Sequence, residues 1–108
     1  WYKRRRYVPG IWASKRGDRD RAIREAVIVP IQGTAADLIK LAMSRLAAAL
    51  PTGAFLVLSV HDEVVVEVGA DQVEEVVGLI KGMADGLFPV TLPIECAVGP
   101  NWTEMKGV

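Results

Sequence analysis

Residues 55–68, with the sequence FLVLSVHDEVVVEV, determine the fold that we expect. Residues 55–60 are an apolar run, and residues 64–68 are a second run rich in β-branched side chains, a composition that favours strands. Only His61, Asp62 and Glu63 separate the two runs. The sequence therefore predicts a tight β-hairpin with His-Asp-Glu at its tip, where aspartate tolerates turn geometry.

Helices are predicted before and after this hairpin in the sequence. Residues 34–50 begin with the capping residue Thr34 and are mostly Ala, Leu, Ile and Met. Residues 71–87 repeat apolar side chains at helical spacing. A third helix is expected to run from Asp18 to about residue 27 and to end by Pro30, because proline has no N–H for the helix hydrogen bond.

The outer parts of the chain are expected to contain strands. Residues 3–11 are typical of a short basic strand that ends in a turn, and residues 91–98 of a final strand, with one helical turn in residues 102–106. The element order predicts an α+β fold in one domain, residues 1–108. Its small antiparallel sheet, with the His-Asp-Glu hairpin, would pack against about three helices on one face.

Charge is unevenly distributed along the chain, although the formal net charge is zero. Residues 1–25 hold nine basic and three acidic residues, a net charge of +6, and the remaining residues hold four basic and ten acidic ones, a net charge of −6. A basic segment of this kind suits a polyanion such as nucleic acid, and a solvated basic surface is the alternative.

The composition indicates a globular protein, because 51% of the residues are apolar. Cys96 is the only cysteine, so it cannot form an internal disulfide and is expected to be a buried structural thiol. No apolar stretch reaches the roughly 20 residues that span a bilayer, and the first residues do not resemble a signal peptide. We therefore expect a cytoplasmic protein without a membrane partner.

The carboxylates of Asp62 and Glu63 are candidate ligands for Mg²⁺, which prefers oxygen donors. Two-metal phosphoryl transfer uses such carboxylates to hold the ions that clamp the attacking and leaving oxygens. Successive residues of an extended backbone point to opposite faces, so one of the two should be the principal ligand. An ordinary polar hairpin tip is the alternative.

Two further segments are candidates for contact with nucleic acid. Residues 30–37, PIQGTAAD, place Gln32 at a predicted helix start, and its amide can read base edges or sugars. Arginines contact phosphates and aromatic rings stack on bases, so a second candidate comprises Arg4, Arg5, Arg6, Tyr7 and Arg24. A tightly packed helix start and a solvated basic face are the alternatives.

Together these segments resemble the last part of family A DNA polymerases, the bacterial DNA polymerase I type. The matching stretches keep the family's order and similar spacing: RRRYVP at residues 4–9, Arg24, PIQGTAADLIK at residues 30–40, VHDE at residues 60–63 and GPNW at residues 99–102. The resemblance implies the C-terminal part of the polymerase palm, including its motif C.

The resemblance also implies roles for particular residues. Asp62 matches the motif C aspartate that holds catalytic Mg²⁺, Glu63 its acidic neighbour, and His61 a residue near the primer 3′ end. Gln32 and Arg24 match residues that contact the minor groove, and Arg4, Arg5 and Arg6 would lie near the DNA backbone. The implied partners are primer-template DNA and deoxynucleoside triphosphates.

The chain also departs from the family. Ile28 stands where the family usually has an asparagine, which removes one minor-groove hydrogen bond. The family's motif A aspartate and the fingers helix find no match in these residues, so the isolated chain is expected to lack polymerase activity. Two alternatives remain: a non-catalytic nucleic-acid-binding module, and a structural remnant whose apolar helix, residues 34–50, self-associates to form a homo-oligomer.

Overall fold

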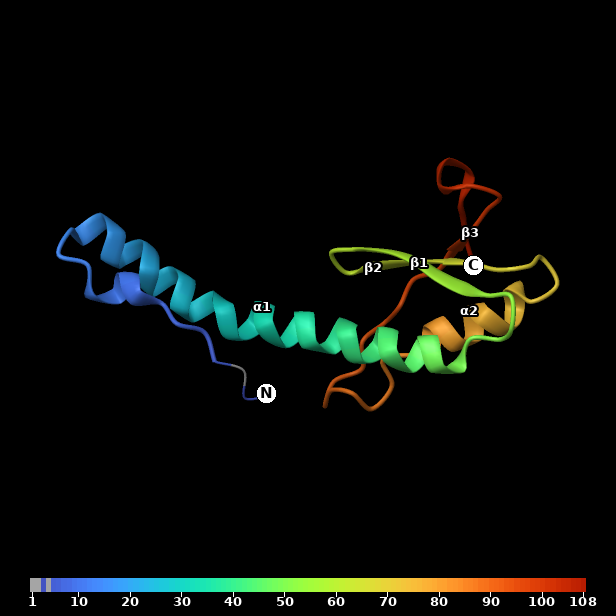
Figure 1. Cartoon of the computed structure of the whole chain (residues 1–108), viewed down its shortest axis with the longest axis horizontal. Coiled ribbons are helices and arrows are strands. Elements are labelled where there is room, and N and C mark those ends of the chain that lie inside the picture. The colour runs from blue at the N-terminus through green and yellow to red at the C-terminus, as the bar shows by residue number, and fades with distance from the viewer. Residues whose placement is uncertain (1–2, 4) are drawn as a thin grey trace. The chain divides into compact units, whose positions relative to one another are not determined.

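The computed structural model describes residue 3 and residues 5–108 (Figure 1). Its fold is α+β, with helices and small antiparallel sheets, as the sequence predicts. The described residues contain two α-helices rather than three. The elements in chain order are η1 (Pro9–Trp12), α1 (Arg16–Ala49), β1 (Phe55–Val60), β2 (Glu63–Glu67), α2 (Val73–Gly82), β3 (Ala97–Val98), η2 (Trp102–Glu104) and β4 (Lys106–Gly107).

Helix α1 runs through Pro30, so the prediction of two separate helices on either side of that proline is wrong. Pro30 removes one backbone donor, whereas a break would create two new helix ends, each with as many as four unpaired backbone groups. The hydroxyl of Thr34 donates a 2.7 Å hydrogen bond to the carbonyl of Pro30. Thr34 is therefore an interior helix residue and not the predicted N-cap.

The chain divides into two compact units, of which the first ends at Asp37 and the second is Leu38–Val108. The second unit has a core in which Ala42, Leu46 and Met83 are buried. Half-buried side chains from α1, the residue after it, the hairpin and α2 pack against these three residues, namely Ile39, Leu50, Leu56, Val64, Val66, Leu79 and Ile80. Three hairpin residues, Leu56, Val64 and Val66, thus pack against this core.

Strands β1 and β2 pair antiparallel, from Phe55 with Glu67 to Val60 with Glu63. A register shift lies between Leu56 and Leu58, so the ladder contains one β-bulge or irregularity near its base. The bounds of β1 are those predicted, and β2 begins one residue earlier than predicted.

Helix α2 is shorter than the predicted range of residues 71–87, because it ends at Gly82. Turns follow it, and Gly86 has a φ of 68°, a left-handed conformation that glycine adopts without steric cost. Two glycines, Gly78 and Gly82, lower the helix propensity of this segment, and the helix stops at the second.

The predicted outer strands are largely wrong. The described residues of 3–11 form no strand, and the 3-10 helix η1 begins at Pro9, while residues 91–98 form strand only at β3, which pairs with β4. Cys96, expected to be buried, is half-buried. A helical turn does form in the tail at η2, where the side chain of Asn101 accepts from the N–H groups of Thr103 and Glu104 at 3.0 and 3.2 Å.

Much of α1 is exposed, and by length and hydropathy it could cross a membrane. One 18-residue window has a mean hydropathy of 1.4 and is 11% buried, contrary to the expectation that no stretch is long and apolar enough. The core helix of a soluble protein passes the same test, so this is a weak indication.

Candidate nucleic-acid interface and metal ligands

His61 and Asp62 form the two-residue connection between β1 and β2, and Glu63 is the first residue of β2. All three residues are exposed. The two strands are paired up to Val60 and Glu63, so the ladder carries the Asp62 side chain to a solvent-accessible turn. Asp62 is therefore available to a ligand and does not belong to the packed interior.

The turn depends on an unusual backbone conformation at His61, whose φ is 55°. A two-residue hairpin turn needs positive φ at its first central position, and glycine is the usual residue there. Histidine adopts this conformation more often than most other side chains, although at some steric cost. The sequence gives no glycine at this turn, so the strain lies directly beside the candidate metal ligand.

Asp62 and Glu63 could supply one or two oxygens to a divalent cation. Among the residues that the structure describes, no group of three or more His, Cys, Asp or Glu side chains is arranged to hold a metal ion. Mg²⁺ binds through one or two carboxylates together with water and substrate phosphates. The donor set at the turn therefore fits a partial Mg²⁺ site that requires further oxygens from substrate or from another part of a larger protein.

Arg24 and Gln32 belong to the first unit and lie on one face of α1, separated by two helical turns. Both are exposed, as is Ile28 between them, with 49% of its surface accessible. The continuous helix fixes the spacing of these three side chains. Ile28 therefore interrupts a row whose other two side chains, Arg24 and Gln32, can donate hydrogen bonds.

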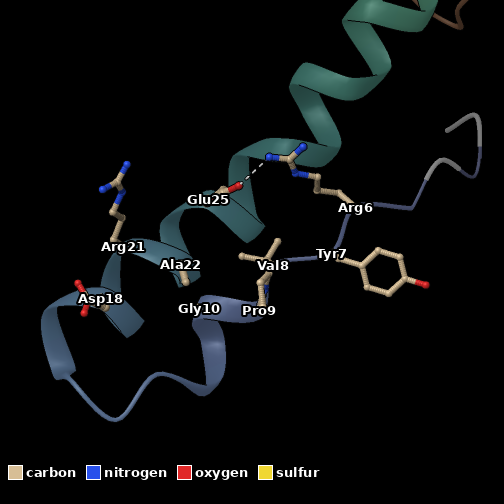
Figure 2. A pocket seen from close by; sticks show the side chains of 9 residues that line it. All are labelled: Arg6, Tyr7, Val8, Pro9, Gly10, Asp18, Arg21, Ala22 and Glu25. Atoms are coloured by element: carbon tan, nitrogen blue, oxygen red, sulfur yellow. Dashed lines mark hydrogen bonds and ion pairs between the residues drawn. The ribbon is translucent and has the colours of Figure 1, made fainter.

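The basic segment before η1 is attached to α1 by an ion pair. Nη2 of Arg6 lies 3.3 Å from Oε1 of Glu25, and the two side chains are 64% and 41% exposed (Figure 2). Arg5 is exposed, and Arg4 lies outside the described residues. Sequence reasoning missed the role of Glu25, although it is the only acidic residue between Asp20 and Asp37 in a strongly basic segment.

An open pocket of about 340 Å³ lies where this segment meets the first turns of α1 (Figure 2). A Cβ atom on Gly10 would lie 3.0 Å from Cβ of Ala22, so the absence of a side chain lets η1 approach the helix closely. The charged residues lining the pocket are Arg6, Asp18, Arg21 and Glu25. A second pocket of about 290 Å³ is lined by Lys3, Arg6 and the buried Asp37, among others.

Arg6 lines both pockets, and each pocket combines basic with acidic side chains. Arginine suits phosphate because its planar guanidinium can donate two parallel hydrogen bonds. The first unit therefore offers a basic surface on which Arg6 already has a carboxylate partner.

The chain is similar to known proteins of one family along nearly its whole length. Residues 1–104 match the model of DNA polymerase family A. The chain is 45% identical to the thermostable DNA polymerase I of Thermus filiformis and 43% identical to DNA polymerase I of Deinococcus radiodurans. Each alignment covers 97% of this chain but only 13% and 11%, respectively, of the relative.

A solved structure supports the same similarity. The POL domain of Pol1 from M. smegmatis, in complex with DNA primer-template and dNTP, superimposes with a TM-score of 0.73 at 36% identity. The match covers 83% of this chain and 16% of that chain. The fold of these residues is thus shared with a small part of a much longer protein.

Proposed function

Because the chain belongs to DNA polymerase family A, we propose that it is the C-terminal palm segment of a DNA-directed DNA polymerase. In the proposed reaction the primer 3′ oxygen attacks the α-phosphorus of a deoxynucleoside triphosphate. A new P–O bond forms in line with the bond to pyrophosphate, which breaks. The match across residues 1–104 is the observation that supports this proposal most strongly.

Asp62 is the residue to which we assign metal binding. Asp62 is exposed at the turn, and Glu63 adds a second carboxylate directly after it. Bound Mg²⁺ would polarise the primer hydroxyl and offset charge on the phosphates. The protein's own contribution is to hold Asp62 at a fixed place on a paired hairpin, so that little reorganisation is needed during the reaction.

The remaining site residues are proposed to hold DNA. Arg24 and Gln32 would donate to minor-groove acceptors, which every correctly shaped base pair presents, so the contacts test geometry without reading sequence. His61 would lie near the primer 3′ end, and the basic residues Arg4, Arg5 and Arg6 near the phosphates.

The isolated chain is proposed to be inactive. Two-metal catalysis needs carboxylates that hold both ions, and the described residues contain no group of three or more metal-binding side chains. The chain spans 13% of the Thermus filiformis relative, so the rest of a polymerase would have to complete the site.

Primer extension tests this proposal. The chain is combined with Thermus filiformis polymerase from which the matching segment has been deleted, and the Mg²⁺-dependent extension rate is measured. Asp62→Ala should lower the rate by at least about a hundredfold, given the usual cost of losing a group that stabilises transition-state charge. Asp85→Ala, at another exposed aspartate of the same unit, is the matched control. Equal rates for both variants would reject the assignment of Asp62.

The basic N-terminal segment favours a second candidate, a non-catalytic nucleic-acid-binding module. Its net charge of +6 predicts DNA binding that weakens steeply with salt. Under this alternative, binding would not depend on Asp62 or on Mg²⁺, and no extension would be detected in the complemented polymerase. The same assay therefore separates the two candidates.

A further inference from the structure

Ile28 lies midway between Arg24 and Gln32 on α1, four residues from each. In an α-helix, a step of four residues advances about 6 Å along the axis and turns about 40° around it. The three side chains therefore share one face, and all three are exposed, with 49% of the surface of Ile28 accessible. Ile28 is the member of this row that has no group able to donate a hydrogen bond.

The residues before α1 cover a different face of the same helical segment. Ala22 is only 5% exposed, and Gly10 approaches it closely. Ala26 and Val29 are half-buried and line a pocket together with residues of the N-terminal segment. The chain itself thus leaves the row open, and Ile28 is available to whatever its two polar neighbours bind.

We propose that Ile28 leaves one base pair of the bound duplex without a hydrogen bond in the minor groove, so that the protein accepts duplexes whose minor groove is altered at that pair. The inference rests on the proposed function, in which Arg24 and Gln32 donate to minor-groove acceptors. These two residues are about 12 Å apart along the helix axis, and base pairs are stacked about 3.4 Å apart. A stretch of groove thus lies between the two donors, and Ile28 faces it.

The direction of the effect follows from desolvation. A minor-groove acceptor that loses water against an apolar side chain, and gains no hydrogen bond, is unfavourable. Replacing this acceptor by a C–H group removes the penalty, so DNA altered at the pair facing Ile28 should bind equally well or better. At a pair facing Arg24 or Gln32, the same replacement leaves a side-chain donor unpaired and should weaken binding. Ile28 is therefore a specificity-determining residue.

Binding of altered primer-templates tests the inference without nucleotide or catalysis. A single 3-deazaadenine, in which C–H replaces the acceptor nitrogen of the minor groove, is placed in turn at successive base pairs behind the primer end. Dissociation constants are measured by fluorescence anisotropy for the chain combined with Thermus filiformis polymerase that lacks the matching segment. The unmodified chain should lose affinity about two- to tenfold at pairs facing Arg24 and Gln32, the usual worth of one hydrogen bond, and none at a pair between them.

Ile28→Asn should add the missing donor, and Ile28→Leu is the matched control because leucine has nearly the shape of asparagine without its amide. With Ile28→Asn, 3-deazaadenine at the intermediate pair should weaken binding about two- to tenfold. With Ile28→Leu, affinity should stay equal or rise, as it does with isoleucine. Ile28→Gln repeats the gain of an amide with a residue of higher helix propensity, so that a disturbed helix cannot explain the result.

Three outcomes would overturn the inference. In the first, the unmodified chain loses affinity at every pair from the one facing Arg24 to the one facing Gln32. In the second, neither amide variant becomes sensitive at the intermediate pair, and in the third Ile28→Leu becomes as sensitive as they do. Absence of DNA binding would reject the proposed function together with the inference. If the binding pattern is as expected but the complex extends no primer, the proposed function fails while the assignment of Ile28 stands.

Discussion

Val60 and Glu63 face each other across the β1–β2 ladder, and this pairing leaves His61 and Asp62 as the whole turn. The consequence is that the candidate metal ligand has no flexible loop around it. Its position is set by the last ladder pair and by the left-handed conformation of its neighbour His61, whose φ is 55°. Hairpin stability would favour glycine at position 61, whereas the proposed function uses the side chains of His61 and Asp62.

Replacing His61 by glycine should stabilise the hairpin and harm the proposed reaction. Glycine adopts a positive φ without steric cost, so we expect His61→Gly to raise the free energy of unfolding by about 1 kcal/mol in denaturant titrations. Primer extension in the complemented polymerase should fall, because the imidazole is proposed to lie near the primer end.

Ser59→Gly is the matched control for that substitution. Ser59 lies inside β1 and pairs with Val64, so glycine there should lower stability by roughly 0.5–1 kcal/mol. If His61→Gly lowered stability by as much as Ser59→Gly does, the turn would not be strained at His61.

Leu46→Ala should strongly destabilise the second unit. Leu46 is 1% exposed and belongs to the core formed with Ala42 and Met83, so truncation would leave a cavity that costs about 2–5 kcal/mol. Leu41→Ala provides the control on the same helix, because Leu41 is 41% exposed and should lose about 1 kcal/mol or less. Equal losses measured by chemical denaturation would contradict the assigned core.

The hairpin strands could be predicted because their signal is local. Residues 55–60 are apolar except for Ser59, and the nearby run at residues 64–68 offers a strand partner after a very short connection. The exposure of Asp62 follows from the same local signal, since a turn between two paired strands lies at the end of the ladder.

The outer strands could not be predicted because a strand requires a partner. Residues 91–98 have strand-like composition, yet only Ala97 and Val98 find one, in Lys106 and Gly107. The sequence marks Glu25 as an isolated acidic residue but does not identify Arg6 as its partner, because 19 residues separate the two. Pro30 misled the prediction because its effect on one hydrogen bond is local, whereas helix continuity depends on the whole segment.

Freeing Arg6 should strengthen DNA binding more than charge alone explains. Its ion pair with Glu25 is exposed, so Glu25→Gln should change stability by less than about 1 kcal/mol. The affinity for duplex DNA, measured by fluorescence anisotropy, should rise because Arg6 no longer has a carboxylate competing with phosphate.

Asp20→Asn makes the same change in net charge without touching Arg6. Oδ2 of Asp20 lies 3.8 Å from Nε of Arg16 on α1, and the two side chains of this pair in the same basic segment are 48% and 88% exposed. A rise in affinity that is larger for Glu25→Gln than for Asp20→Asn supports competition at Arg6. Equal rises would show that only the overall charge matters, and the salt dependence of both variants would then steepen alike.

Pro30→Ala should stabilise α1, because alanine restores a backbone donor and removes the clash of the proline ring with the preceding turn. A proline inside a helix costs about 3 kcal/mol relative to alanine, and we expect a gain of about 1–3 kcal/mol in denaturant titrations. Thr34→Val tests the hydroxyl that donates to the Pro30 carbonyl at 2.7 Å, and should lose about 1 kcal/mol or less. In the complemented polymerase, Pro30→Ala should also alter primer extension if Pro30 bends α1 and so sets the direction of the helical turn that carries Gln32. Unchanged stability and unchanged extension together would show that α1 accommodates Pro30 without strain.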